Sequence, residues 1–165
     1  MSITYSSITD PAALQALHIS VAEGAGGFLA RSADECSLSY FQTVIEHSLS
    51  SGINIGAYDG DKLVGFIYAY KSRLKVFNHV LSNMTLGVHP QYQNQGIGKN
   101  LVSRFMIDVE SKKDIIRIEL FTVEVNKQAI KLYESFGFKQ EGVFRDRAVL
   151  NNKLVNDIAM AWLRS

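Results

Sequence analysis

The sequence contains little cysteine, little proline and no excess of charge of either sign, and each absence excludes a class of protein. Cys36 is the single cysteine among 165 residues, which excludes an internal disulfide and a cysteine-based zinc cluster. The 17 basic and 16 acidic residues leave a formal charge of +1, so no broad field favours nucleic acid or an anionic membrane. No apolar run is long enough to cross a bilayer, and the first residues lack the features of a signal peptide. We therefore expect a cytoplasmic protein with neither nucleic acid nor membrane among its partners.

Linkers, low-complexity tracts and internal repeats are also absent. A length of 165 residues with 47% hydrophobic content is enough for one packed core. Only Pro11 and Pro90 interrupt the chain, and neither marks a boundary. The sequence therefore predicts a single domain over residues 1–165.

The spacing of apolar residues predicts four helices and seven strands. The helices are expected from Pro11 to near Gly24, at about 37–50, from Ile97 through Val109, and from the cap Asn126 to Gly137. The strands are expected at 3–8, 53–58, 62–70, 79–88, 114–123, about 138–145 and 153–163, with a turn at Asp59-Gly60, a loop containing Asn151-Asn152 and a mobile connection at 23–35. The helix between strands 79–88 and 114–123 forms a crossover unit, which predicts that these two strands are parallel.

The glycine-rich turn before that helix, QYQNQGIGKN at 91–100, resembles two phosphate-binding loops and fits neither. A Walker A loop requires glycine at the position of Gln93 and Ser or Thr at that of Asn100. The dinucleotide fingerprint requires a third glycine where Leu101 stands. A helix that begins here still presents unpaired backbone N–H groups, which favour an anion. The turn therefore indicates either an anion site built from backbone amides or simply a tight turn.

Two motifs resemble those of the GNAT N-acetyltransferase superfamily. The stretch LGVHPQYQNQGIGKNLV (86–102), which contains Gln93-x-x-Gly96-x-Gly98, is similar to its acyl-CoA-binding motif. The stretch VNKQAIKLYESFGFKQEG (125–142) is similar to its following motif, in which an asparagine starts a helix and a tyrosine precedes Gly-Phe. The tail EGVFRDRAVLNNKLVNDIAMAWL looks like a small bacterial branch of the superfamily.

This resemblance implies an α/β fold: a mixed, mostly antiparallel twisted sheet of about seven strands, with a splayed parallel pair and about four helices. It implies acetyl-CoA as co-substrate without a metal, and transfer of the acetyl group to a primary amine by direct attack in a ternary complex. It also implies that the backbone of a strand contacts the pantetheine arm of the cofactor, and that backbone amides at the start of a helix bind its pyrophosphate. The residues implied in cofactor binding are Leu86, Gly87, Val88, Gln93, Asn94, Gln95, Gly96, Ile97, Gly98, Lys99 and Asn126.

The resemblance also implies that Tyr133 is the general acid. A phenol with a pKa of about 10 keeps its proton at neutral pH and can protonate a departing thiolate. The alternative is a core aromatic, because Tyr133 lies on an apolar helix face. Asn126 has a similar alternative as a helix N-cap. The backbone N–H of Val88 is a candidate oxyanion donor.

The general base is harder to assign. Relatives often carry a carboxylate at the position of Asn83, and an amide cannot act as a base. Water relayed to Glu119, Glu23 or His79 is an alternative, although each also reads as an ordinary surface or hydrogen-bonded residue. The other histidines, which show no mutual metal-ligand spacing, are His18, His47 and His89.

We therefore expect an N-acetyltransferase acting on a small-molecule amine or a peptide N-terminus, as a monomer or homodimer. A non-catalytic acyl-CoA-binding sensor with the same fold is the alternative, and a nucleotide-binding module is disfavoured by the failed loop patterns. The amide at Asn83 favours an amine of low pKa, such as an α-amine, over a lysine side chain. Acceptor contacts are expected from loops at 23–36 and 144–153, with Arg31, Arg145 and Arg147 as candidates to meet a carboxylate.

Overall fold

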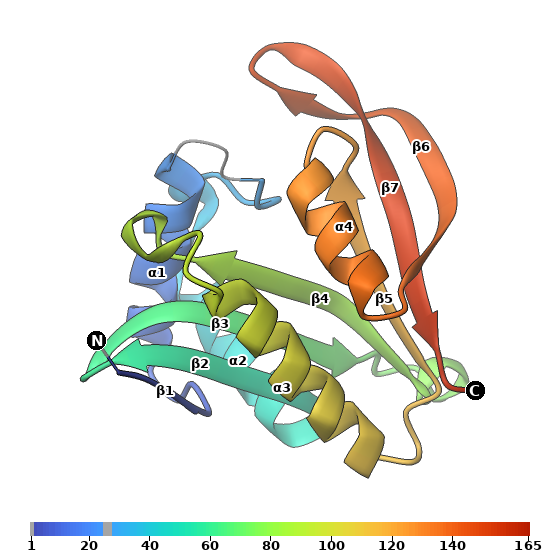
Figure 1. The fold of residues 1–165 in the computed structure, drawn as a ribbon, viewed down its shortest axis with the longest axis horizontal. Helices are drawn as coiled ribbons and strands as arrows, with labels where there is room; N and C mark the ends of the chain where they lie inside the picture. The colour runs from blue at the N-terminus through green and yellow to red at the C-terminus, as the bar shows by residue number, and fades with distance from the viewer. Residues whose placement is uncertain (1, 25–27) are drawn as a thin grey trace.

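Seven strands form a single sheet in the order β1-β2-β3-β4-β5-β7-β6 (Figure 1). The computed structural model describes residues 2–24 and 28–165, so residues 25–27 of the predicted connection lie outside the described residues. The strands are β1 Ile3–Ser6, β2 Gly52–Asp59, β3 Lys62–Lys71, β4 Val80–Val88, β5 Arg117–Val123, β6 Lys139–Leu150 and β7 Lys153–Leu163. The α-helices are α1 Pro11–Glu23, α2 Leu38–Ser51, α3 Ile97–Ser111 and α4 Lys127–Ser135, and the 3₁₀ turns are Ala33–Glu35, Lys75–Phe77 and Pro90–Tyr92.

The sheet is antiparallel except where β4 meets β5, which are parallel as the crossover pattern predicts. Helices α1 and α2 cover one face, and α3 and α4 lie on the other (Figure 1). The predicted fold class is therefore confirmed. Among the described residues, no helix is long and apolar enough to cross a bilayer.

Each face of the sheet has its own apolar core. On the α3 and α4 face, the buried residues include Leu101, Phe105 and Ile118. On the α1 and α2 face, Leu14 and Phe41 are buried against β3. Burial of apolar side chains at helical spacing thus fixes the helices against the strands.

Local signals set the ends of α1, of α4 and of the β2–β3 hairpin where the sequence places them, whereas β1 ends earlier and β5 begins later than expected. The Asp10 side chain accepts a hydrogen bond from the backbone N–H of Ala12 at 2.9 Å, which caps α1 beside Pro11. Gly60 turns the β2–β3 hairpin with φ of 59°, and Gly137 follows α4 with φ of 90°. Both values lie in the left-handed region, which glycine enters at little cost.

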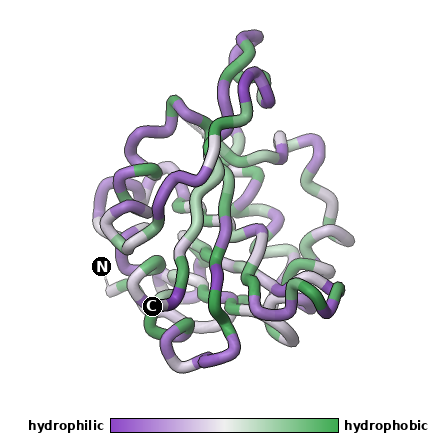
Figure 2. The backbone as a smooth tube through the Cα atoms, turned by 90° about the vertical axis from the view of Figure 1, so that its right-hand side faces the viewer, coloured by the Kyte–Doolittle hydropathy of each residue, from purple (hydrophilic) through white to green (hydrophobic). Residues whose placement is uncertain are grey.

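The β6–β7 hairpin corrects one prediction. Strand β6 continues to Leu150 rather than ending at 145, so the expected loop at 144–153 is mostly strand. Asn151 and Asn152 have φ of 50° and 59° and form a tight two-residue turn, which asparagine tolerates well. The hairpin projects from the body of the molecule (Figure 2).

Candidate active site

Strands β4 and β5 begin as a parallel pair and then separate. Their pairing is limited to Val80 with Arg117 and Leu81 with Ile118, although both strands continue for several more residues. Beyond this point the two strands diverge (Figure 1). The splay predicted from the family resemblance is therefore present, and it leaves the facing edges of both strands without a ladder.

In an antiparallel pair, hydrogen-bonded and non-hydrogen-bonded residue pairs alternate, and this alternation decides which backbone groups of β4 face the gap. His89 donates its backbone N–H to the Val64 carbonyl at 2.8 Å, which fixes these two residues as a hydrogen-bonded pair. Counting back along the register, Gly87 also bonds to β3, whereas Leu86 and Val88 occupy non-hydrogen-bonded positions. The backbone N–H and C=O groups of Leu86 and Val88 therefore point toward the splay.

Gly87 has a packing role as well. A Cβ atom at this position would lie 2.5 Å from the ring of Phe66, which is fully buried on the neighbouring strand. Only glycine therefore lets the β4 backbone approach that ring. The backbone N–H and C=O of Gly87 pair with β3. Of the three β4 residues predicted to contact the pantetheine arm, Gly87 is therefore the one whose backbone polar groups point away from the gap.

The start of α3 supplies a second set of unpaired groups. Gly96 has φ of 82° and no side-chain cap, and the first intrahelical bond runs from the Asn100 N–H to its carbonyl at 3.0 Å. The N–H groups of Ile97, Gly98 and Lys99 therefore have no partner within the helix. A Cβ at Gly98 would lie 3.7 Å from the Val88 side chain, so this glycine sits directly beside the end of β4.

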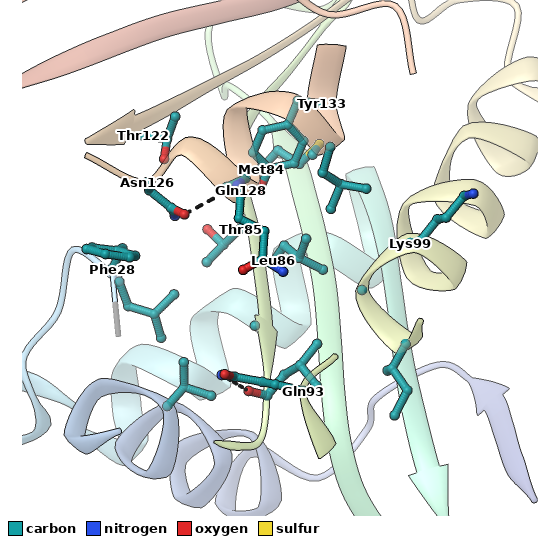
Figure 3. Close-up of a pocket in the computed structure, with 18 of the residues that line it drawn as sticks. Phe28, Met84, Thr85, Leu86, Gln93, Lys99, Thr122, Asn126, Gln128 and Tyr133 are labelled. Carbon is teal, nitrogen blue, oxygen red and sulfur yellow. Dashed lines mark hydrogen bonds between the residues drawn. The ribbon is translucent and has the colours of Figure 1, made fainter. Parts of the chain in front are cut away.

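These two sets of backbone groups open into one cleft of about 650 Å³. Tyr133, Asn126 and Gln128 reach it from the side of β5 and α4, opposite Leu86 and Gln93 (Figure 3). The predicted residues that line it are Leu86, Gly87, Val88, Gln93, Asn94, Gly96, Ile97, Gly98, Lys99, Asn126 and Tyr133. Gln95 is not among the lining residues: its side chain donates to the Gln91 carbonyl at 3.2 Å instead.

Gln93 closes one of the free positions on β4. Its side-chain amide donates to the Val88 carbonyl at 3.1 Å (Figure 3). The carbonyl is thereby satisfied, and the N–H of Val88 is left as the free donor at this end of the strand. A further contact, from the Gln128 amide to the Asn94 side-chain oxygen at 3.5 Å, links α4 to the loop before α3.

Tyr133 and Asn126 occupy the opposite side of the cleft and each combines two roles. Tyr133 is 6% exposed, lies 5.8 Å from the ring of Phe138 and still lines the cleft. Burial raises the pKa of its phenol, so the hydroxyl is protonated at neutral pH. Asn126 accepts a hydrogen bond from the Ala129 N–H at 3.3 Å and so caps α4 while facing the cleft.

None of the base candidates reaches the cleft. Asn83 has φ of 56° in a β-bulge of β4 and is exposed outside the lining residues. Glu119 pairs with Arg117 at 2.9 Å, while Glu23 and His79 are exposed elsewhere. Among the described residues that line the cleft, Asp, Glu and His are all absent. Across all the residues that the structure describes, no group of three His, Cys, Asp or Glu side chains is placed to hold a metal ion.

None of the arginines suggested as acceptor contacts is among the described lining residues, and Arg145 is exposed. Arg31 lies 3.5 Å from the centre of the Tyr40 ring, and Arg147 stacks on Phe121 at 4.5 Å. Arg147 also pairs with Asp157 at 3.3 Å. Only Phe121 of these residues lines the cleft.

Several lining residues were not predicted from the sequence. They come from β5 and from α4: Thr122, Gln128, Lys131 and Leu132, whereas Phe28 and Leu29 lie in the 23–36 loop from which acceptor contacts were expected. Strand β5 alternates buried and partly exposed positions like any half-covered strand, so nothing in its sequence distinguishes the residues that face the gap.

Comparison with known proteins gives matches to one family. A sequence profile of the acetyltransferase (GNAT) family matches residues 24–138. The chain is 37% identical over 94 residues to the N-alpha-acetyltransferase RimI of Mycobacterium tuberculosis, covering 55% of this chain and 54% of that protein. It is 31% identical over 93 residues to the [ribosomal protein bS18]-alanine N-acetyltransferase of Escherichia coli K12, covering 53% and 62%. The matches thus span little more than half of these relatives.

Solved structures resemble the whole chain. A GNAT family acetyltransferase from Streptococcus pneumoniae aligns with a TM-score of 0.89 at 20% identity, covering 99% of this chain and 100% of that one. The yncA protein of Salmonella typhimurium, solved with its cofactor acetyl-CoA, aligns with a TM-score of 0.83 at 17% identity, covering 99% and 94%. At these identities, the likeness establishes the fold.

Proposed function

The chain belongs to the GNAT family of acetyltransferases, and from that premise we propose that it transfers an acetyl group from acetyl-CoA to a primary amine by direct attack in a ternary complex. The observation that carries the proposal is the meeting of two sets of unpaired backbone groups in one cleft. Leu86 and Val88 supply strand groups at the splay, and the first turn of α3 supplies N–H groups a short way along. Acetyl-CoA contributes an activated thioester, an amide-bearing arm and a pyrophosphate, which suit these groups in that order.

The residues have separable roles in this proposal. The N–H groups of Ile97, Gly98 and Lys99 bind the pyrophosphate at the positive end of the helix. Leu86 offers its backbone N–H and C=O to the amides of the pantetheine arm. The Val88 N–H, which faces the splay from a non-hydrogen-bonded position of the β3–β4 ladder, donates to the oxygen that becomes negative during attack.

Tyr133 completes the chemistry as the general acid. Attack of the amine on the thioester expels a thiolate, which needs a proton. The raised pKa of the buried phenol keeps that proton available across the neutral range. The same burial makes Tyr133 part of the core, so one side chain serves packing and proton donation together.

The acceptor we propose is an α-amine, as found at a peptide N-terminus or on a free amino acid. A lysine-like amine with a pKa of about 10.4 is neutral in about one molecule in 2,500 at pH 7, at a cost of about 4.6 kcal/mol. An α-amine with a pKa of about 8 is neutral in roughly a tenth of molecules, at about 1.4 kcal/mol. Because no Asp, Glu or His is found among the described lining residues, the cheaper deprotonation is favoured. Relatives named as alanine and N-alpha acetyltransferases support the same class.

Two measurements test the proposal. Calorimetric titration with acetyl-CoA, CoA, ATP and NAD should give binding of the two CoA compounds only. Release of free thiol should then be followed with matched α-amino and ε-amino acceptors, and kcat/KM compared from pH 7 to 9.5. We expect the α-amine to be the better substrate at pH 7. A preference for the ε-amine there would refute the acceptor class, and tight acetyl-CoA binding without turnover on any amine would point to a sensor.

A further inference from the structure

A row of three polar side chains, from His18 through Tyr68 to Thr85, leads from the otherwise apolar α1 and α2 face to the cleft. His18 on α1 is 3% exposed, and its Nε2 lies 3.1 Å from the Tyr68 hydroxyl on β3. Tyr68 is 2% exposed and is paired directly with Thr85 across the β3–β4 ladder, so both side chains project on the same face. Thr85 lines the cleft and donates its hydroxyl to the Asn83 carbonyl at 2.9 Å.

The unpaired Nδ1 of His18 indicates which group donates in the hydrogen bond between His18 and Tyr68. Nδ1 is buried and has no hydrogen-bond partner among the described residues. A buried acceptor without a partner is better tolerated than a buried N–H, so the proton is placed on Nε2, which donates to Tyr68. Burial and the nearby Arg31 lower the pKa of His18 to about 3, which keeps the ring neutral. The Tyr68 hydroxyl then accepts from His18 and keeps its own proton to donate, while Thr85, its partner across the β3–β4 ladder, gives its proton to Asn83 and keeps an oxygen that can accept.

The row ends where β4 changes its pairing. Asn83 and Met84 lie opposite Ala69 alone, which makes a two-to-one bulge with Asn83 in the left-handed region. Before the bulge, β4 pairs with β5; after it, the strand carries the free groups of Leu86 and Val88. The bulge therefore decides the direction in which those groups enter the cleft.

We propose that His18, Tyr68 and Thr85 are positioning residues that hold the Asn83 bulge, and through it the strand segment that stabilises the oxyanion. This assignment deepens the proposed acetyl transfer and rests on it. His18 and Tyr68 do not contact the reacting atoms, because neither residue lines the cleft. Loss of the row should therefore lower turnover more than it weakens the binding of acetyl-CoA, because the pyrophosphate is still held by α3 and only the strand contacts of Leu86 and Val88 depend on the bulge.

Tyr68→Phe is the first test, because it keeps the ring and removes the central hydroxyl. We expect kcat to fall about tenfold, with the Kd of acetyl-CoA rising at most about threefold through Leu86. Thr85→Val should have a similar effect and Thr85→Ser should restore most of the activity. Tyr58→Phe is the matched control, because its hydroxyl donates to the Ser7 carbonyl at 3.5 Å and neither residue is among the described residues that line the cleft. The double variant His18→Phe/Tyr68→Phe removes both polar groups of the buried pair, so it should recover thermal stability while turnover stays low.

Amide hydrogen exchange of the free protein tests the positioning role without any substrate. The N–H groups of Thr85 and Gly87 bond to β3, and we expect their exchange to accelerate at least tenfold in Tyr68→Phe while amides of α3 are unchanged. Variants that keep kcat within twofold, or that lose kcat with unchanged exchange, would overturn the proposal. If the unaltered protein acetylates no amine, the proposed function fails, and the exchange of Thr85 and Gly87 still decides whether the row holds the bulge.

Discussion

Along one wall of the cleft, β4 and α3 present unpaired backbone groups beside side chains such as Leu86 and Gln93, whereas β5, α4 and the segment after residue 27 contribute side chains to the rest of the lining. The backbone wall depends on glycines, on a left-handed turn at Gly96 and on the alternation of a strand ladder. The side-chain wall depends on which residues happen to point inward, such as Tyr133 and Phe121. The first wall suits acetyl-CoA, which is the same ligand in every reaction of this type. The side chains of the second wall can differ between proteins that use different acceptors.

Tyr133→Phe should have the largest effect on turnover and leave the backbone wall intact. The change keeps the ring against Phe138 and removes only the proton that a thiolate would take. We expect kcat to fall about 100-fold, within the range for general acids, with the Kd of acetyl-CoA unchanged. Steady-state kinetics and calorimetry on the same preparations measure both. A fall of less than about threefold, or roughly 0.6 kcal/mol of barrier, would return Tyr133 to a purely packing role.

Gly98→Asp should have the converse effect. The carboxylate would stand beside Val88 at the first turn of α3, where the pyrophosphate is expected. We expect the Kd of acetyl-CoA to rise about 30-fold, because like charges oppose each other at close range. Gly142→Asp is the matched control, since a Cβ there meets nothing within 4 Å and the residue lies on β6. Equal affinities in the two folded variants would remove the pyrophosphate from this site.

The sequence was informative for the backbone wall and much less so for the other. Glycine spacing at Gly96 and Gly98 marks positions where backbone geometry leaves few alternatives. On the opposite wall, Asn126 and Tyr133 were predicted from the family resemblance. The lining role of Thr122 or Gln128 depends on how far β5 turns away from β4, which is a property of the assembled sheet. The length of β6 was misjudged because asparagine pairs read as a loop as readily as a tight turn. Gln95 was counted with the site because adjacent loop residues cannot be assigned a direction from sequence.

Phe121→Ala should alter the acceptor and spare acetyl-CoA. Phe121 lines the cleft and packs against Phe144 at 5.7 Å and under Arg147, so its loss removes one apolar surface and loosens the hairpin. We expect the KM of the acceptor to rise about fivefold, while the KM of acetyl-CoA changes less than twofold. Phe144→Ala supplies the control, because it loosens the same cluster without lining the cleft. If Phe144→Ala raises the KM of the acceptor as much as Phe121→Ala does, the effect comes from the loosened hairpin and not from the lost cleft surface.

The smallest effect is expected from Asn83→Asp, which restores the carboxylate that relatives often carry. Aspartate adopts the left-handed conformation of this bulge nearly as well as asparagine, so the backbone should be preserved. Because the side chain is exposed and outside the cleft lining, the new carboxylate should not reach an amine beside the thioester. The ratio of kcat/KM for matched ε-amino and α-amino acceptors at pH 7 should therefore change less than twofold. A tenfold gain for the ε-amine would mean that position 83 does communicate with the acceptor, and that the amide, rather than the distance, excludes lysine-like substrates.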